Sequence, residues 1–156
     1  LPSVLYSGVF LDMVCDQTIP VLDLQAFQGD RAERQAFVEQ VGQALENIGF
    51  FAITNHGVDA DLIQKAYQVA QQFFELPDAV KQRYELPELH GQRGFTSFGK
   101  EHAKDHPFPD LKEFWHTGRS LPTGHPLTTI YPNNVSVAEV PEFDSVIAQL
   151  YGQLEA

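Results

Sequence analysis

Histidines are the residues of this chain best suited to chemistry, and five of its six lie in the second half of the sequence. An imidazole nitrogen can bind a metal ion or act as a general base near neutral pH. His102 and His106 have the spacing of two zinc ligands on one helical face, but Pro107 disfavours a helix there. Glu113 and His116 match half of a di-iron motif that has no second copy. Spacing alone therefore predicts no metal site and no catalytic residue.

Other familiar catalytic patterns are missing from the sequence. It contains no nucleophile elbow, phosphate-binding loop or dinucleotide fingerprint. Cys15 is the only cysteine, which excludes an intrachain disulfide and a cysteine-based zinc site. A chain without disulfides suits a reducing compartment, so we expect a cytoplasmic protein.

Charge and hydropathy exclude two classes of partner. The net charge is -11, from 10 basic and 21 acidic residues, whereas nucleic acids and anionic membranes both require a basic face. No apolar run reaches the roughly 20 residues of a membrane span. The first basic residue is Arg31, so the sequence lacks the positively charged start of a signal peptide. Met13 is the only methionine, and we expect it to be the natural start, with residues 1–12 lying upstream of it. In the expected domain organisation, residues 1–18 are an N-terminal extension.

The first part of the chain predicts helices around a short sheet. Residues 50–54 are almost all apolar, aromatic or β-branched and predict a buried central strand. Residues 19–24 predict an edge strand, because Pro20 cannot donate to a ladder. Apolar residues recur at helical spacing over 31–48 and 59–75, so both segments predict amphipathic helices. The expected fold class is mixed α/β (α+β), with helices packed on a small sheet.

The second part of the chain alternates short strands with polar loops. Pro77 begins a short predicted helix, and residues 94–99 and 112–116 predict two strands. A last helix is predicted to follow Pro141 and to run to the end of the sequence. We expect its apolar residues to be partly uncovered and to drive self-association. These residues are Val146, Leu150 and Leu154.

The order of these motifs resembles the N-terminal region of iron(II)/2-oxoglutarate-dependent dioxygenases, and in particular the isopenicillin N synthase-like family. The resemblance covers nearly everything from residue 19 to residue 156. One departure is Ser136-Val137, which stands where many members carry Trp-Pro and blurs the subfamily. The matching motifs are 19–24, 49–51 with 55–58, 73–77, 94–95, 110–114, and 134 with 141–143.

The resemblance implies where the iron centre of such a protein would lie. The family's core is a double-stranded β-helix (jelly roll) that holds iron by a His-x-Asp/Glu pair and a distant histidine. None of the six histidines here is followed two residues later by an acid. The resemblance therefore implies that residues 19–156 are a non-haem dioxygenase N-terminal domain, truncated before the iron-binding core, whose small sheet would extend the downstream jelly roll. Fe(II) and 2-oxoglutarate are the implied cofactors of the full-length protein, and we expect this chain alone to bind neither.

The resemblance also implies a substrate pocket lined by the strands around Gly94 and Trp115. Its candidate residues are Arg93, Phe95, Phe98 and Phe114. Arg93 could pair with a substrate carboxylate or be an exposed surface charge. Phenylalanines at such positions are more often core residues than substrate contacts. We expect Glu113 to pair with a neighbouring base.

These observations predict the N-terminal portion of an oxygenase that oxidises a small organic substrate by hydroxylation, desaturation or ring closure. Two alternatives remain open. The chain could be a free-standing non-catalytic binding module derived from such an enzyme. It could also be a metal hydrolase that uses the histidines between residues 88 and 125.

Overall fold

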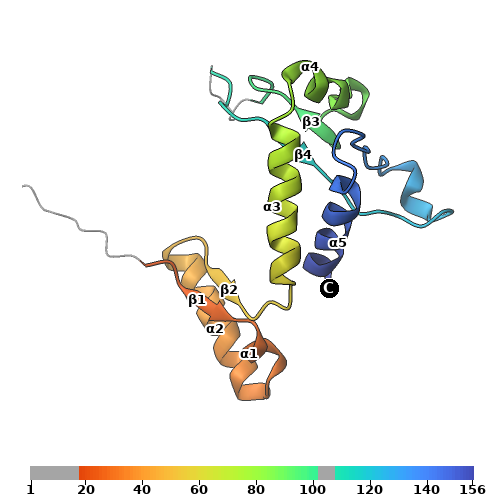
Figure 1. Cartoon of the computed structure of the whole chain (residues 1–156). Coiled ribbons are helices and arrows are strands. Elements are labelled where there is room, and N and C mark those ends of the chain that lie inside the picture. Colours follow the sequence, from red (N-terminus) through yellow and green to blue (C-terminus); the bar gives the residue numbers. More distant parts are fainter. Residues whose placement is uncertain (1–17, 102–107) are drawn as a thin grey trace, which may run out of the picture. The chain divides into compact units, whose positions relative to one another are not determined.

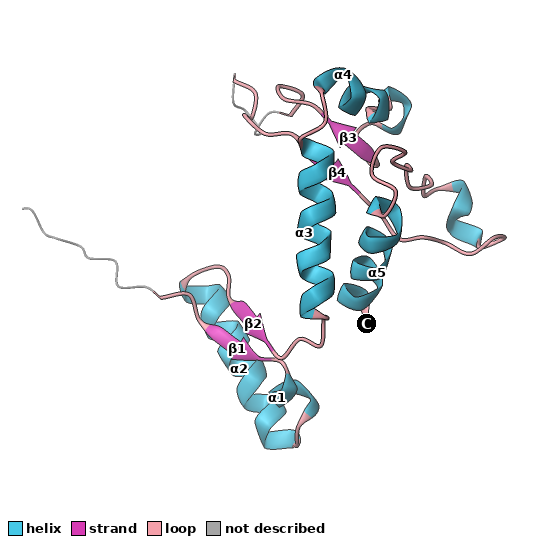
Figure 2. Cartoon of the chain, viewed as in Figure 1, coloured by secondary structure: helices cyan, strands magenta, loops and turns pink. Residues whose placement is uncertain are grey.

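The computed structural model describes residues 18–101 and 108–156 (Figure 1). Within the chain, contacts divide into an N-terminal unit, residues 1–56, and a C-terminal unit, residues 57–156, which are described separately here. Helices and short strands occur in both units, so the predicted mixed fold class is confirmed (Figure 2). Several residues discussed above lie outside the described part: the extension up to residue 17 with Met13 and Cys15, and the pair His102 and His106.

The N-terminal unit is a strand–helix–strand arrangement. Strand β1 (Val21–Asp23) pairs in parallel with β2 (Ala52–Thr54), and Val21 lies opposite Ala52. Parallel neighbours need a long crossover connection, which α1 (Gln25–Gln28) and α2 (Arg31–Asn47) provide. The helix predicted over 31–48 is thus confirmed to within one residue. Among residues 18–56, the small core of this unit consists of three buried residues: Leu22, Phe37 and Ala44.

A capping box fixes the start of α2. The Asp30 carboxylate accepts hydrogen bonds from the backbone N–H groups of Ala32 at 2.8 Å and Glu33 at 3.0 Å. The Glu33 carboxylate in turn accepts from the backbone N–H of Asp30 at 2.9 Å. These reciprocal bonds satisfy donors that the first helical turn leaves without partners.

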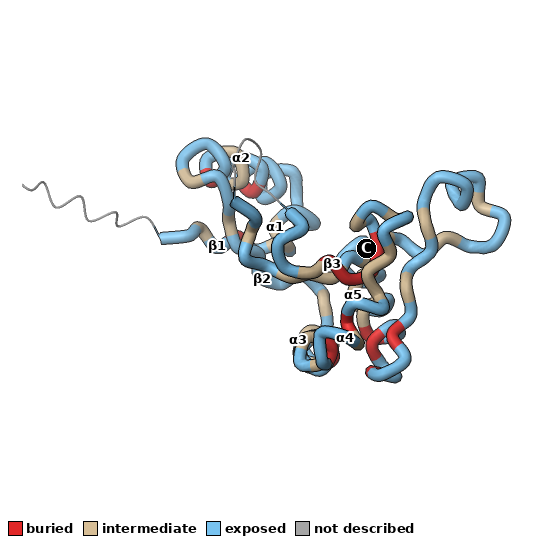
Figure 3. Tube along the Cα trace, turned by 90° about the horizontal axis from the view of Figure 1, so that it is seen from above, coloured by how far each residue is buried: buried red, intermediate tan, exposed pale blue. Residues whose placement is uncertain are grey.

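The prediction of a buried central strand over 50–54 is wrong. All three residues of β2 are exposed, Phe50 is 55% exposed, and Phe51 is only half-buried (Figure 3). Among the described residues, strand β2 pairs with β1 alone, and α2 packs against α1 and β1 rather than against β2. Because β2 has only one partner strand in the described part of the chain and a helix on one side of the sheet, its residues stay open to water even though residues 50–54 are largely apolar.

The larger core lies in the C-terminal unit, between two long helices and a hairpin-like sheet. Helix α3 (Ala60–Phe74) lies beside α5 (Phe143–Glu155) (Figure 1). Both helices were predicted from their apolar spacing, but their contact with each other was not. Asp59 caps α3 by accepting from the backbone N–H of Asp61 at 2.8 Å. The side chain of Phe73 is fully buried. Its ring contacts five other aromatic rings: Phe74, Tyr84, Phe95, Trp115 and Phe143.

The second sheet is antiparallel and shorter than predicted. Strand β3 (Gly94–Thr96) pairs with β4 (Phe114–His116), and Phe95 lies opposite Trp115. Gly94 is required here, because its φ is 79° and a Cβ would lie 2.5 Å from the carbonyl oxygen of Tyr84. The connection from α3 to β3 contains α4 (Asp78–Lys81) and the 3₁₀ turns η1 (Gln82–Tyr84) and η2 (Pro87–Leu89). A further turn, η3 (Pro126–Thr129), precedes α5.

The predicted apolar face of the last helix is covered more fully than expected. Val146 is buried at 6% exposure, because α5 packs along α3. Leu150 is half-buried, and only Leu154, at 69%, is largely open to water. Among the described residues, no helix combines the length and apolar character that crossing a membrane requires.

Candidate functional site

The C-terminal unit contains a cavity of about 590 Å³ beside β3. This volume is typical of small-molecule sites in proteins. Its wall combines the η1–η2 segment with residues of β3 and β4, so it brings together segments that are distant in the sequence. Polar side chains from these segments include Gln82, Glu85, His90, Thr96, Lys100 and His116.

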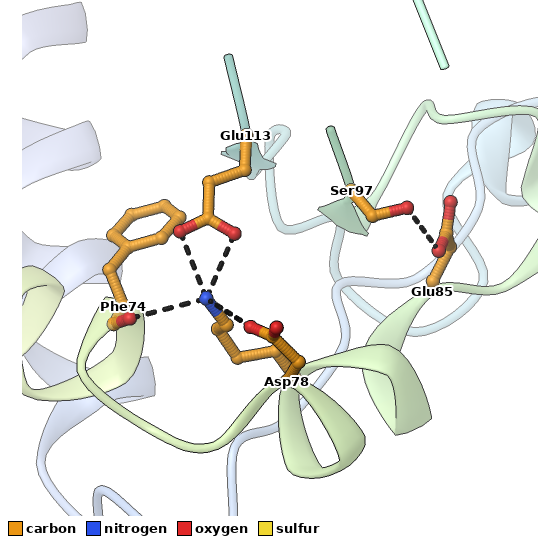
Figure 4. Close-up of polar contacts among 6 residues, drawn as sticks. Phe74, Asp78, Glu85, Ser97 and Glu113 are labelled. Atoms are coloured by element: carbon orange, nitrogen blue, oxygen red, sulfur yellow. Dashed lines mark hydrogen bonds and ion pairs between the residues drawn. The ribbon is translucent and has the colours of Figure 1, made fainter. Parts of the chain in front are cut away.

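The acidic groups of the cavity are already paired. Glu85 accepts a hydrogen bond from the Ser97 hydroxyl at 2.9 Å (Figure 4). It also lies 3.8 Å from the Lys100 ammonium. Glu101 lies 2.9 Å from the ammonium of Lys112. Because the carboxylates are compensated, the cavity does not present a strong net field to a ligand.

Thr96 brings a buried hydroxyl to the cavity wall. The residue is 7% exposed, and its Oγ1 atom has no hydrogen-bond partner among the described residues. A buried polar atom left without a partner costs about 1–3 kcal/mol. The sequence analysis did not single out Thr96. No local signal in the sequence identified it.

The four predicted pocket residues occupy different environments. Phe95 lines the cavity but is mainly a core residue at 2% exposure. Phe98 is 58% exposed, and neither it nor Arg93 nor Phe114 belongs to the cavity wall. Phe114 is half-buried, with its ring centroid 4.8 Å from that of His116. The structure therefore brings only Phe95 to the cavity.

Arg93 is buried, so the alternative of an exposed surface charge does not hold. The residue is 9% exposed, and its Nη1 donates to the carbonyl oxygen of Gln92 at 2.6 Å. Within the part of the chain that the structure describes, its Nε has no hydrogen-bond partner and no acidic residue forms an ion pair with it. A Cβ at Gly118 would overlap the guanidinium, so the glycine makes room for it. A guanidinium in such a setting is suited to a carboxylate partner.

Glu113 forms the ion pair expected for it, with Lys81 of α4. The Lys81 ammonium donates to both carboxylate oxygens of Glu113 at 2.9 Å and lies 3.2 Å from Asp78 (Figure 4). Burial alone would lower the pKa of Lys81, but the hydrogen bonds to Glu113 and Asp78 outweigh it and raise that pKa above its usual value. The lysine is therefore held in its charged form.

The described residues do not fit an iron ion. Non-haem iron of the facial-triad type needs two histidines and one carboxylate converging on one point. Within 18–101 and 108–156, no three His, Cys, Asp or Glu residues gather closely enough to hold a metal. We therefore assign no step of a reaction to a metal held by these residues, and the described histidines give no support to a metal hydrolase.

Residues 19–139 match a family model described as non-haem dioxygenase in morphine synthesis, N-terminal. The match covers well over half of the chain, so the chain belongs to this non-haem dioxygenase N-terminal family.

The relatives and the similar solved structure bear the names of 2-oxoglutarate-dependent oxygenases. The 2-oxoglutarate-dependent dioxygenase tropC of Talaromyces stipitatus is 30% identical over 116 residues, covering 71% of this chain and 36% of the relative. A 2-oxoglutarate-Fe(II) type oxidoreductase of Aspergillus fumigatus is 32% identical over 115 residues, covering 73% and 34%. A solved structure of a 2OG-Fe(II) oxygenase family protein from Caulobacter crescentus has a TM-score of 0.72 and 33% identity, covering 88% and 44%. The chain thus spans less than half of the length of these relatives.

Proposed function

We propose that the chain is the N-terminal portion of an iron(II)/2-oxoglutarate-dependent oxygenase that oxidises a small organic substrate. The observation that carries this proposal is the family match over residues 19–139, and the C-terminal unit also contains a cavity of small-molecule size. Iron(II) and 2-oxoglutarate would be held outside the described residues, where together they would serve to activate molecular oxygen, which is the oxidant. The described residues would bind and orient the substrate.

The cavity wall suits a small molecule with both apolar and polar parts. Phe95 offers an aromatic surface, and Thr96, His90 and His116 bring groups that can donate or accept hydrogen bonds. Arg93 lies outside this wall, and its pairing with a substrate carboxylate through the guanidinium is a separate part of the proposal. Whether the outcome is hydroxylation, desaturation or ring closure depends on which substrate atom is presented to the oxidant, so the pocket wall controls it.

The test compares this chain with the same chain extended by its downstream sequence. We expect the extended protein to convert 2-oxoglutarate to succinate in an iron- and oxygen-dependent manner, and this chain alone to show neither turnover nor stoichiometric iron(II) binding. Calorimetric titration with iron(II) under anaerobic conditions measures the binding, and a succinate assay measures the turnover. An extended protein that binds small molecules but forms no succinate would instead support a free-standing binding module.

A further inference from the structure

Lys81 is the meeting point of four segments of the C-terminal unit. Its ammonium is 2.9 Å from both carboxylate oxygens of Glu113, 3.2 Å from Asp78 and 3.3 Å from the carbonyl oxygen of Phe74 (Figure 4). It also lies 5.6 Å from the ring centroid of Phe95. The side chains of Lys81 and Glu113 are 6% and 16% exposed, so water screens this pair only weakly.

Lys81, Phe95 and Glu113 each belong to the cavity wall or are close to it in sequence. Gln82, the residue after Lys81, lines the cavity from η1. Phe95 lines it from β3, and His116, three residues after Glu113, lines it from β4. The ion pair therefore links the two sides of the wall without being part of it.

We propose that the Lys81–Glu113 ion pair is a positioning device of the substrate cavity, which fixes the turn that carries Gln82 against the strand that carries His116. This inference rests on the proposed function, because it takes the cavity to be the place where substrate binds. Lys81 and Glu113 act through their neighbours and are positioning residues.

The physical argument is that fold stability alone does not require charges here. Taking two charges out of water is costly, and an apolar pair of similar volume is often as stable as a buried ion pair. The hydrogen bonds of an ammonium to several oxygen atoms have preferred directions, whereas the contacts of an apolar side chain do not. The ion pair therefore specifies a geometry that apolar packing would leave loose.

The decisive variant replaces the pair by apolar residues of similar size, Lys81→Met with Glu113→Leu. Trp115 is the only tryptophan of the chain and lies in β4 between Glu113 and His116, so its near-ultraviolet circular dichroism reports the position of that strand. We expect a Tm within about 5 °C of the wild type, together with a clearly altered Trp115 spectrum. In the extended protein we expect succinate formation to fall about tenfold or more, as for a misplaced site.

A matched control uses the exposed ion pair between Lys65 and Glu142, 2.7 Å apart, with side chains 40% and 65% exposed. Lys65→Met with Glu142→Leu should leave the Trp115 spectrum and succinate formation unchanged. Should the buried double variant not fold, Lys81→Arg keeps the charge but changes the donor directions, and the same spectral change is expected.

A folded variant of the buried pair with a wild-type Trp115 spectrum would overturn the inference and leave the pair as a structural contact only. Absence of succinate in the wild-type extended protein would instead refute the proposed function, while the Trp115 comparison would still decide the role of the pair.

Discussion

The rings of Phe73 and Trp115 meet edge to face with their centroids 4.8 Å apart. This contact joins the end of α3 to β4, and so connects the core of the C-terminal unit to the strand beside the cavity. Edge-to-face aromatic pairs contribute beyond the area that they bury. Phe73 is therefore the residue on which both the core and the strand beside it depend.

Truncation of Phe73 should be severely destabilising. Phe73→Ala removes a fully buried ring that packs against five others, and we expect a loss of about 3–5 kcal/mol in the free energy of unfolding. Tyr67 is on the same helix and 74% exposed, so Tyr67→Ala should cost less than about 0.5 kcal/mol. Urea denaturation measures both, and equal effects would show that the core is elsewhere.

The contact between Gly118 and Arg93 predicts a coupled pair of substitutions. Gly118→Ala places a methyl group where the guanidinium lies, and we expect a loss of about 1–3 kcal/mol. Combining it with Arg93→Met should reduce that loss, because a flexible apolar chain can move aside. Gly42→Ala, in helix α2 with open space around it, is the control and should be neutral or stabilising by up to about 1 kcal/mol. If the changes in unfolding free energy of Gly118→Ala and Arg93→Met simply add in a double-mutant cycle, the contact between these two residues is ruled out.

Arg93 should contribute to binding more than to stability. Because Arg93 forms no ion pair with a described residue, Arg93→Met should change the free energy of unfolding by less than about 1 kcal/mol. In the extended protein the same change should weaken binding of a carboxylate substrate about tenfold or more. Arg31→Met, at an exposed position of α2, should change neither quantity. A large loss of stability without a loss of affinity would assign Arg93 to the scaffold.

Stability in acid should depend on the contact between Tyr84 and Glu139. The Tyr84 hydroxyl donates to the Glu139 carboxylate and lowers the pKa of Glu139, and the Arg83 guanidinium acts in the same direction. A lowered folded-state pKa contributes stability above the unfolded value, about pH 4, and this contribution is lost as the pH falls through the folded-state pKa. Tyr84→Phe should therefore lower stability near neutral pH and flatten its decline below about pH 4.

Equilibrium unfolding at a series of pH values from neutral to acid tests this expectation. The exposed Tyr131→Phe serves as the control and should keep the wild-type acid dependence. A Tyr84→Phe variant whose stability declines with pH as steeply as that of the wild type would contradict the assignment.

Loss of the Asp30 cap should weaken the N-terminal unit. Asp30→Ala removes the acceptor of two backbone hydrogen bonds and should cost about 1 kcal/mol, whereas Asp30→Ser keeps an acceptor and should cost less. Amide hydrogen exchange in α2 provides the measurement. Equal exchange in the alanine and serine variants would mean that the cap does not stabilise the helix.

The helices could be predicted from the sequence because their signals are local. Apolar spacing and the caps Asp30 and Asp59 define α2 and α3 to within a residue or two. The exposure of β2 could not be predicted, since burial of a strand depends on how many neighbours it has. Composition says only that residues 50–54 are apolar.

The residues that line the cavity could not be predicted from local sequence patterns either. Its wall draws on Gln82, Thr96 and His116, which come together only when β3 and β4 pair. The burial of Arg93 depends on space left by Gly118, which follows it at a distance in the chain. Motif order suggested that this region forms a pocket wall, but only the fold identifies the residues that do.

The partners of Phe73 also bear on how the chain folds during synthesis. Both strands of the N-terminal unit have been synthesised once Thr54 is made. Three of the rings that cover Phe73 are synthesised well after it, first Phe95, then Trp115 and finally Phe143. Translation proceeds from the N-terminus at roughly 5–20 residues per second. The apolar face of α3 therefore remains uncovered for several seconds, and during that interval a nascent chain offers a hydrophobic surface to chaperones.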